Sequence, residues 1–304
     1  MGVKTMTYNW IHQAPHRHQV SQDTGQWLGL LDENFHALLE LPAVGNLTWP
    51  KARGAIDSVS MTMRVRTPSG GLHSIVQELV AENLGKTDTA GRLIPITGPA
   101  RFIRRERPHT TPRTMRITHV TVDGDAELPH TITIHGVTMT SYLDLLPCPS
   151  NPLTWTGQFT RFTRDWIGDE EEQELFRKPR DLAPATIITV ADGASVQGPA
   201  ATVIHKLITD SINAAHRIRH IAPGSEIYAA ILEPSQWESP RIILRPTDQT
   251  IWKEVADAAM VSGVGIHVEL WCPGDPVVAG KSWDLPTIVI TIRQEGEIDD
   301  DADL

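Results

Sequence analysis

The chain has 304 residues, of which 40% are apolar and 21% charged, so it is long enough for two domains with ordinary hydrophobic cores. Its formal net charge of −10 argues against a surface that coats nucleic acid, and we expect no sequence-specific nucleic-acid binding. The apolar runs are too short to cross a membrane, and residues 1–10 lack the apolar core of a secretory signal. Two cysteines, Cys148 and Cys272, lie far apart, which favours folding in a reducing cytoplasm.

The first half of the chain predicts a β-rich domain. Residues 1–26 are polar and rich in His, and we interpret them as an N-terminal arm that only a partner orders. Residues 27–147 form the β-rich domain, with strands predicted at 60–66, 100–105, 113–122 and 131–140. Apolar residues at helical spacing predict a helix over 72–84 that packs on this domain. A shift in the apolar alternation at Gly136 predicts a β-bulge there.

The second half changes in composition and pattern. Residues 148–184 hold several prolines and aromatic residues, and we interpret them as a connector between domains. Residues 185–294 predict an α+β domain, and residues 295–304 form an acidic tail. Strands are predicted at 185–190, 227–232, 241–244, 264–270 and 287–293. One helix carries an apolar stripe from Ile204 to Ala215, and Asp248 is predicted to cap a second helix.

A search for catalytic motifs finds none. The chain has no glycine-rich nucleotide loop, no HExxH, no GxSxG and no CxxC, so we predict no enzyme activity, catalytic residue, cofactor or metal. His216 and His220 lie four residues apart on a predicted helix, but no third metal ligand has a matching spacing. Surface histidines are therefore the favoured interpretation.

Charge is unevenly distributed along the chain. Arginines crowd residues 101–116, and acidic residues crowd the tail. These runs are either solvated faces or complementary edges that meet a neighbouring subunit. The candidate assembly interface comprises Arg64, Arg66, Arg101, Arg104, Arg105, Phe159, Phe162 and Trp166.

The order of features resembles that of a known family. An apolar opening at residues 28–31 is followed by Leu47-Thr48-Trp49, the arginine-bearing strand and the helix. A Gly-Pro turn then leads into the basic strand at 98–105, and an Ile-x-Ile-x-Gly strand follows at 132–136. This order resembles phage tail-tip (baseplate) hub proteins and minor tail proteins, including the N-terminal hub region of tail-associated lysins, in the style of phages that infect actinobacteria.

The resemblance implies a fold and a role. The fold is α+β and β-rich: a tail-tube-like β-barrel or sandwich with a packed helix, followed by a second α+β hub domain. The role is that of a structural protein of a siphovirus-type tail tip, folded in the host cytoplasm and located in the virion. The resemblance implies a homotrimeric ring that closes the tail tube and contacts the distal tail protein, the tape-measure protein and other minor tail proteins. No lysin domain follows, so peptidoglycan cleavage is not expected.

Two alternatives remain open. The first is a distal tail protein that forms a sixfold ring, which the number of subunits would distinguish. The second is a tail protein that binds or hydrolyses cell-wall polysaccharide, in which tryptophans stack on sugars; core packing is the favoured interpretation for these side chains. The tryptophans concerned are Trp237, Trp252, Trp271 and Trp283. Release of fragments from host cell wall would identify a hydrolase.

Overall fold

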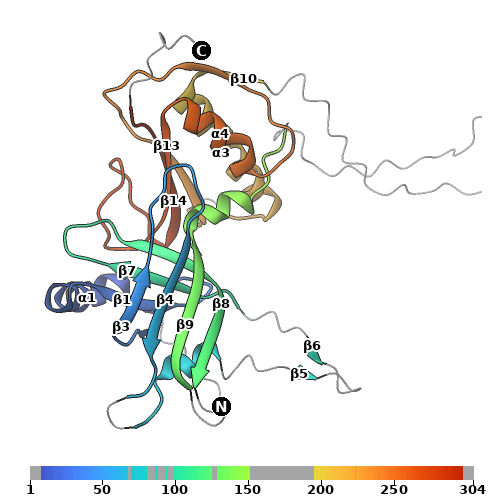
Figure 1. Cartoon of the computed structure of the whole chain (residues 1–304). Helices are drawn as coiled ribbons and strands as arrows, with labels where there is room; N and C mark the ends of the chain where they lie inside the picture. The colour runs from blue at the N-terminus through green and yellow to red at the C-terminus, as the bar shows by residue number, and fades with distance from the viewer. Residues whose placement is uncertain are drawn as a thin grey trace, which may run out of the picture.

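The computed structural model describes residues 8–67, 70–80, 86–87, 93–94, 99–124, 129–150, 195–222 and 224–296. The fold is mixed α+β and rich in antiparallel strands, as the sequence predicts. A curled seven-stranded sheet forms the first half, and a smaller mixed sheet with two helices forms the second (Figure 1). The predicted strand at 185–190, most of the connector and most of the acidic tail lie outside the described residues.

The seven-stranded sheet is antiparallel throughout, in the order β2-β1-β7-β8-β9-β4-β3. Its strands are β1 (Trp27–Leu31), β2 (Ala37–Glu40), β3 (Val44–Thr48), β4 (Ser58–Arg64), β7 (Phe102–Glu106), β8 (Arg113–Gly124) and β9 (Pro129–Thr138). Two further short strands, β5 (Lys86–Thr87) and β6 (Leu93–Ile94), pair with each other and with no other described strand. Alternating apolar and polar residues along β4 and β9 bury one face of the sheet and expose the other.

The sheet is curled because its two edge strands are neighbours in sequence. Residues 41–43 alone connect β2 to β3. Such a link spans about 14 Å at most, whereas the edges of seven flat strands would lie roughly 29 Å apart. The layer β8-β9-β4-β3 therefore folds over β2-β1-β7, and the result is sandwich-like. Among the described residues β2 and β3 do not pair with each other, so no hydrogen-bonded barrel closes.

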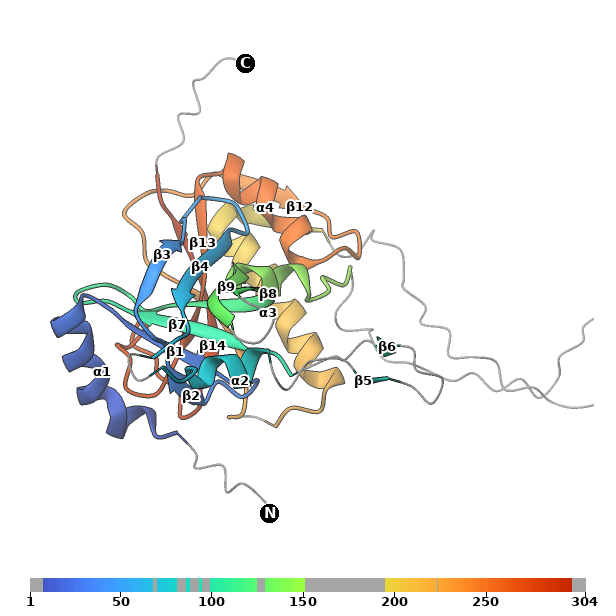
Figure 2. The same ribbon diagram turned by 60° about the horizontal axis from the view of Figure 1, so that its bottom comes forward.

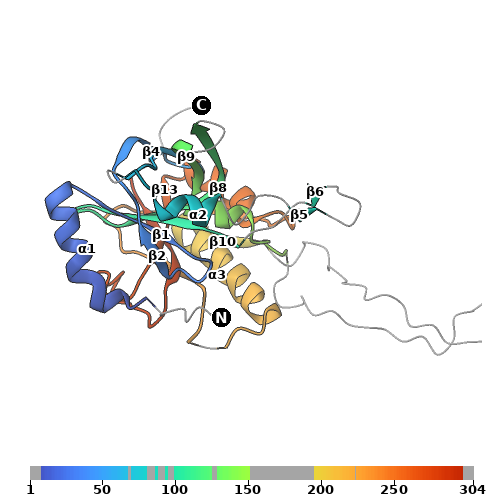
Figure 3. The same ribbon diagram turned by 90° about the horizontal axis from the view of Figure 1, so that it is seen from below.

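The space between the two layers holds the first hydrophobic core. Every strand of the sheet contributes to it, and the fully buried side chains include Leu30, Met61, Ile103 and Ile134. The short helix α2 (Ser74–Leu79) lies across one end of this core (Figure 3). Its buried face confirms the predicted packing of an apolar stripe on the sheet. The described helix is shorter than predicted, and residues 81–84 lie outside the described part.

The second half packs two helices against a three-stranded sheet. Its elements are η2 (Met139–Asp144), β10 (Val196–Pro199), α3 (Ala200–Ile218), β11 (Tyr228–Leu232), β12 (Arg241–Leu244), α4 (Ile251–Val261), β13 (Val264–Trp271) and β14 (Thr287–Gln294). In the order β11-β14-β13, β11 runs parallel to β14 and β13 antiparallel to it. Helices α3 and α4 lie on one side of this sheet (Figures 1 and 2). Thr250, not the predicted Asp248, caps α4.

One continuous core joins the two halves. It contains Trp27 and Phe102 from the first sheet together with Ile204 of α3 and Ile290 of β14. The division into domains at 27–147 and 185–294 stays a prediction, since contact between two domains also buries apolar residues.

Two further local predictions are wrong. Instead of an arm ordered only by a partner, residues Trp10–Thr24 form the helix α1, which lies along one side of the molecule (Figure 3). Its buried Trp10 and Arg17 dock the helix on the first sheet. Because two side chains make this contact, the sequence shows no repeating apolar pattern that would predict a helix. The bulge lies on β8 near Thr118, opposite Gly136, while β9 itself keeps its alternation. The apolar Val137 is half-buried, and Met139 belongs to η2.

Candidate assembly surface

The predicted interface arginines have different surroundings in the structure. Arg64 and Arg66 are exposed. Arg101 is only 16% exposed and pairs within the chain, with Nη1 donating to Glu33 Oε2 at 3.0 Å. The predicted aromatic residues of this interface, Phe159, Phe162 and Trp166, lie outside the described residues.

Arg104 is buried, so it offers no surface to a neighbouring subunit. Its Nη2 donates to both carboxylate oxygens of Asp275, at 2.6 and 2.8 Å, and its Nε donates to Glu106 Oε1 at 2.8 Å. Nη1 donates to the Leu270 carbonyl oxygen at 2.9 Å, and the guanidinium lies 5.2 Å from the Trp10 ring centroid. Burial alone would lower the pKa of Arg104, but the acidic groups around it outweigh burial and raise it. Arg104 therefore links α1, the first sheet and the loop after β13.

Arg105 and Arg113 lie on the neighbouring face and stack on Trp49. They are directly opposite each other on β7 and β8, and their guanidinium carbons lie 4.8 and 5.5 Å from the Trp49 ring centroid. Arg113 also donates to the carbonyl oxygens of Trp49 and Pro50 and lies 3.7 Å from Glu269 Oε1. These contacts fasten the segment after β3 to the first sheet and to β13.

Glu269 sits where β13 meets the start of β8. Its Oε2 accepts the Thr114 N–H at 2.9 Å. Burial raises the pKa of Glu269 from its ordinary value of 4.5 to about 7, although the Thr114 N–H and Arg113 lower it. The folded chain therefore binds this proton more tightly than the unfolded chain does. Between about pH 4.5 and pH 7 this group makes stability fall as pH rises.

Replacing Glu269 by Gln is expected to flatten that pH dependence. The variant keeps an acceptor for the Thr114 N–H but loses the titration. Because the side chain is 31% exposed, we expect a difference of only about 2 kcal/mol between pH 5 and pH 8. Urea unfolding of both proteins at the two pH values measures it. Equal pH dependence in the two proteins would contradict this account of Glu269.

The outer layer β8-β9-β4-β3 carries two free edges, which the sequence analysis did not identify. β8 pairs with β7 only through residues 113–116, plus one bond from the Ile117 N–H to the Arg101 carbonyl oxygen. In the described part of the chain, residues 118–124 have a strand on one side only, that of β9. β3 likewise pairs only with β4. Unpaired edges of this kind are templates for pairing with another chain.

The two free edges are connected by rows of residues that lie opposite one another on the neighbouring strands β8, β9, β4 and β3. One row runs Val120, Ile134, Met61 and Leu47, with all four side chains toward the core. The next row runs Thr121, Thr133, Thr62 and Asn46 on the outer face, where the Thr62 and Thr133 hydroxyls bond at 2.9 Å. Copies added edge to edge would continue both the apolar inner face and the polar outer face.

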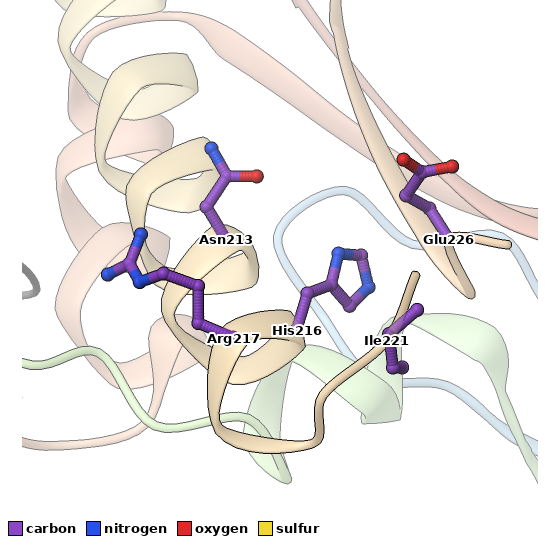
Figure 4. Close-up of a pocket in the computed structure, with 5 residues that line it drawn as sticks. All are labelled: Asn213, His216, Arg217, Ile221 and Glu226. Atoms are coloured by element: carbon purple, nitrogen blue, oxygen red, sulfur yellow. The ribbon is translucent and has the colours of Figure 1, made fainter. Parts of the chain in front are cut away.

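A shallow pocket of about 280 Å³ lies at the end of α3 (Figure 4). Its lining residues are Asn213, His216, Arg217, Ile221 and Glu226. His216 is 8% exposed, its ring stacks on Tyr228, and its Nε2 has no hydrogen-bond partner among the described residues. It is thus largely buried, contrary to the predicted surface position. Burial lowers the pKa of His216.

The described residues were compared with the requirements of a metal site, a reactive thiol and a sugar-stacking surface. Within that part of the chain, no group of three or more His, Cys, Asp or Glu side chains is placed to hold a metal ion. Burial raises the pKa of both Cys148 and Cys272 to about 12, so neither is a thiolate at neutral pH. Among the tryptophans proposed for sugar stacking, Trp271 is buried and Trp252 and Trp283 pack against cores, whereas Trp237 is 38% exposed.

Comparison with known proteins gives only weak likenesses among solved structures, one of which is described here. No family model matches the chain, and no curated protein matches it. A solved structure, the E. coli c3393 protein, is described as a component of the type VI secretion system with structural similarity to the T4 bacteriophage tail proteins gp27 and gp5. The match covers 88% of this chain and 45% of that one, at 7% identity and a TM-score of 0.28. This value is too low to show a common fold, so function rests on the contacts described above. Across the described segments, no helix is both long and apolar enough to span a membrane.

Proposed function

We propose that the chain is a structural subunit of a ring at a phage tail tip, where it acts as a trimeric hub that closes the tail tube of a siphovirus-type virion. Its neighbours are the distal tail protein, the tape-measure protein and other minor tail proteins. The main support for a ring is that β8 and β3 each have a free edge. Residues at these two edges lie in the same cross-strand rows of one sheet. The tail-tip location follows the resemblance in feature order.

Strand direction supports pairing between copies. Each of the three steps from β3 through β4 and β9 to β8 is antiparallel, so β3 and β8 run in opposite directions. Rotation about an axis along the strands leaves directions unchanged, so β8 of one copy meets β3 of the next as an antiparallel pair. The two edges are different surfaces, and such heterologous contacts build closed rings. Ladder bonds and the continued core would hold the ring, since exposed ion pairs contribute about 1 kcal/mol or less each.

A cysteine pair tests this pairing. Thr121 and Asn46 are exposed and lie three strand spacings apart in one copy, roughly 14 Å. A disulfide requires Cα atoms within about 7 Å, so Thr121→Cys with Asn46→Cys can cross-link only between copies. Mild oxidation of assembled protein is expected to give covalent species larger than dimers on a non-reducing gel. Cys148 and Cys272 are buried and should not interfere.

The matched control moves one cysteine away from the edge. Thr133 lies in the same row as Thr121, but on the interior strand β9. Thr133→Cys with Asn46→Cys should give few covalent species, and each single variant should give dimers at most. If the edge pair cross-links no better than this control, the edge-to-edge ring is refuted. A reconstruction of the particle then counts subunits: three support the hub, and six would support a distal tail protein instead.

A further inference from the structure

A cluster of positive charge lies beside Trp49 on the surface of the first sheet. We name Lys51, Arg105, Arg107 and Arg113 the basic cluster. Arg105 and Arg113 are cross-strand partners, an arrangement in which like charges repel. Lys51 and Arg107 are exposed, and Arg105 and Arg113 are half-buried. The cluster therefore concentrates four cations on one accessible surface.

The described residues supply little negative charge to this cluster. Glu269 approaches Arg113 to 3.7 Å, and no ion pair reaches Arg105 from the described part of the chain. Burial, Arg113 and Arg107 together lower the pKa of Arg105 and outweigh Glu269, which raises it. The neighbouring Glu106 is taken by Arg104 and Arg17. Four cations facing one carboxylate form a site for an anionic partner.

An anionic segment of the same chain begins close by. Residues 297–303 carry Glu297, Asp299, Asp300, Asp301 and Asp303. The segment follows Glu295 and Gly296, and Glu295 Oε2 lies 3.8 Å from Arg53 Nε. Arg53 comes four residues after Trp49, so at most about 15 Å of backbone separates the residue that Glu295 approaches from Trp49 at the cluster. Seven extended residues reach about 24 Å, which is longer than that stretch of backbone.

We propose that residues 297–303 bind the basic cluster of their own chain. Carboxylates of the segment then neutralise Arg105 and Arg107, the two arginines of the cluster that form no ion pair with the described residues. This contact does not depend on the ring, because it forms within one copy on a surface separate from the free rows of β8 and β3.

Peptide binding tests the contact. The probe is a fluorescent peptide of residues 297–303, and fluorescence anisotropy measures its binding to dilute full-length chain and to a chain truncated after Gly296. The truncated chain is expected to bind the peptide at least tenfold more tightly, because the full-length chain fills its own site. Raising salt from 50 to 500 mM should weaken binding at least tenfold, since exposed charges are screened. A peptide with Asn in place of each Asp should not bind.

Matched substitutions identify the surface. In the truncated chain, Arg105→Gln with Arg107→Gln is expected to weaken peptide binding five- to tenfold, whereas Arg64→Gln, an exposed arginine on β4, should leave it unchanged. Equal peptide binding by the full-length and truncated chains would overturn the proposal. Equal peptide binding by the Arg105→Gln, Arg107→Gln variant and the Arg64→Gln variant would also overturn it. Self-association that disappears on truncation would assign the segment to a neighbouring copy and refute the contact within one chain.

Discussion

Replacing Arg104 by Met is expected to lower the free energy of unfolding by about 3–5 kcal/mol, because it leaves buried carboxylate without its partner. The Asp275 side chain is 9% exposed, and both of its oxygens accept from Arg104. Glu106 retains Arg17, whose Nε donates to it at 3.0 Å, so the main cost falls on Asp275. Urea unfolding followed by circular dichroism measures the difference.

Arg105→Met is the control for this prediction. Arg105 adjoins Arg104 in β7 and stacks on Trp49, but it makes no ion pair with the described residues. We expect its replacement to cost less than about 1 kcal/mol. A second variant, Arg104→Met with Asp275→Leu, removes both charges and should recover part of the lost stability. If Arg104→Met costs no more than Arg105→Met, Arg104 does not hold the parts of the chain together.

The sequence predicts those elements whose residues follow one clear period. β4, β8, β9, β13 and β14 lie close to their predicted positions, because each alternates apolar and polar residues. Helix α3 is predicted by its apolar stripe for the same reason. Helix α1 escapes prediction because its docking relies on Trp10 and on the charged Arg17, which a hydrophobic pattern does not record.

The site was harder to predict than the fold. The basic run at residues 101–116 identifies arginines but not their orientation. Arg104 points inward while Arg105 stacks on Trp49, because successive side chains of a strand face opposite sides. The free edges of β8 and β3 depend on which strands pair and on where β7 begins, and both are properties of tertiary structure. The sequence feature that could have indicated the free edge of β8 is the Gly98-Pro99 pair just before β7. Proline has no N–H to donate, so β7 cannot easily extend its hydrogen-bonded pairing with β8.

Replacing Gly136 by Ala is expected to destabilise the protein by about 3 kcal/mol, because β8 approaches this glycine too closely for a methyl group. An added Cβ would lie 2.5 Å from the Arg116 carbonyl oxygen and 3.0 Å from Met115 Sδ. Methionine can move, but the carbonyl belongs to a strand that is paired on both sides at Arg116. The backbone at Gly136 has no positive φ, so the cost is one of space. Thermal and urea unfolding measure it.

Gly45→Ala provides the comparison within the same layer. Gly45 lies on the edge strand β3, where an added Cβ would meet only the Thr62 carbonyl oxygen at an ordinary 3.6 Å. Alanine also reduces the freedom of the unfolded chain, so this variant should be neutral or more stable by up to about 1 kcal/mol. A Gly136→Ala variant as stable as Gly45→Ala would mean that β8 can move away from β9. The bulge near Thr118 would then not fix the register between β8 and β9. Without a fixed register, Val120 and Thr121 of β8 need not align with the rows that reach β3, and the proposed ring pairing would lose its support.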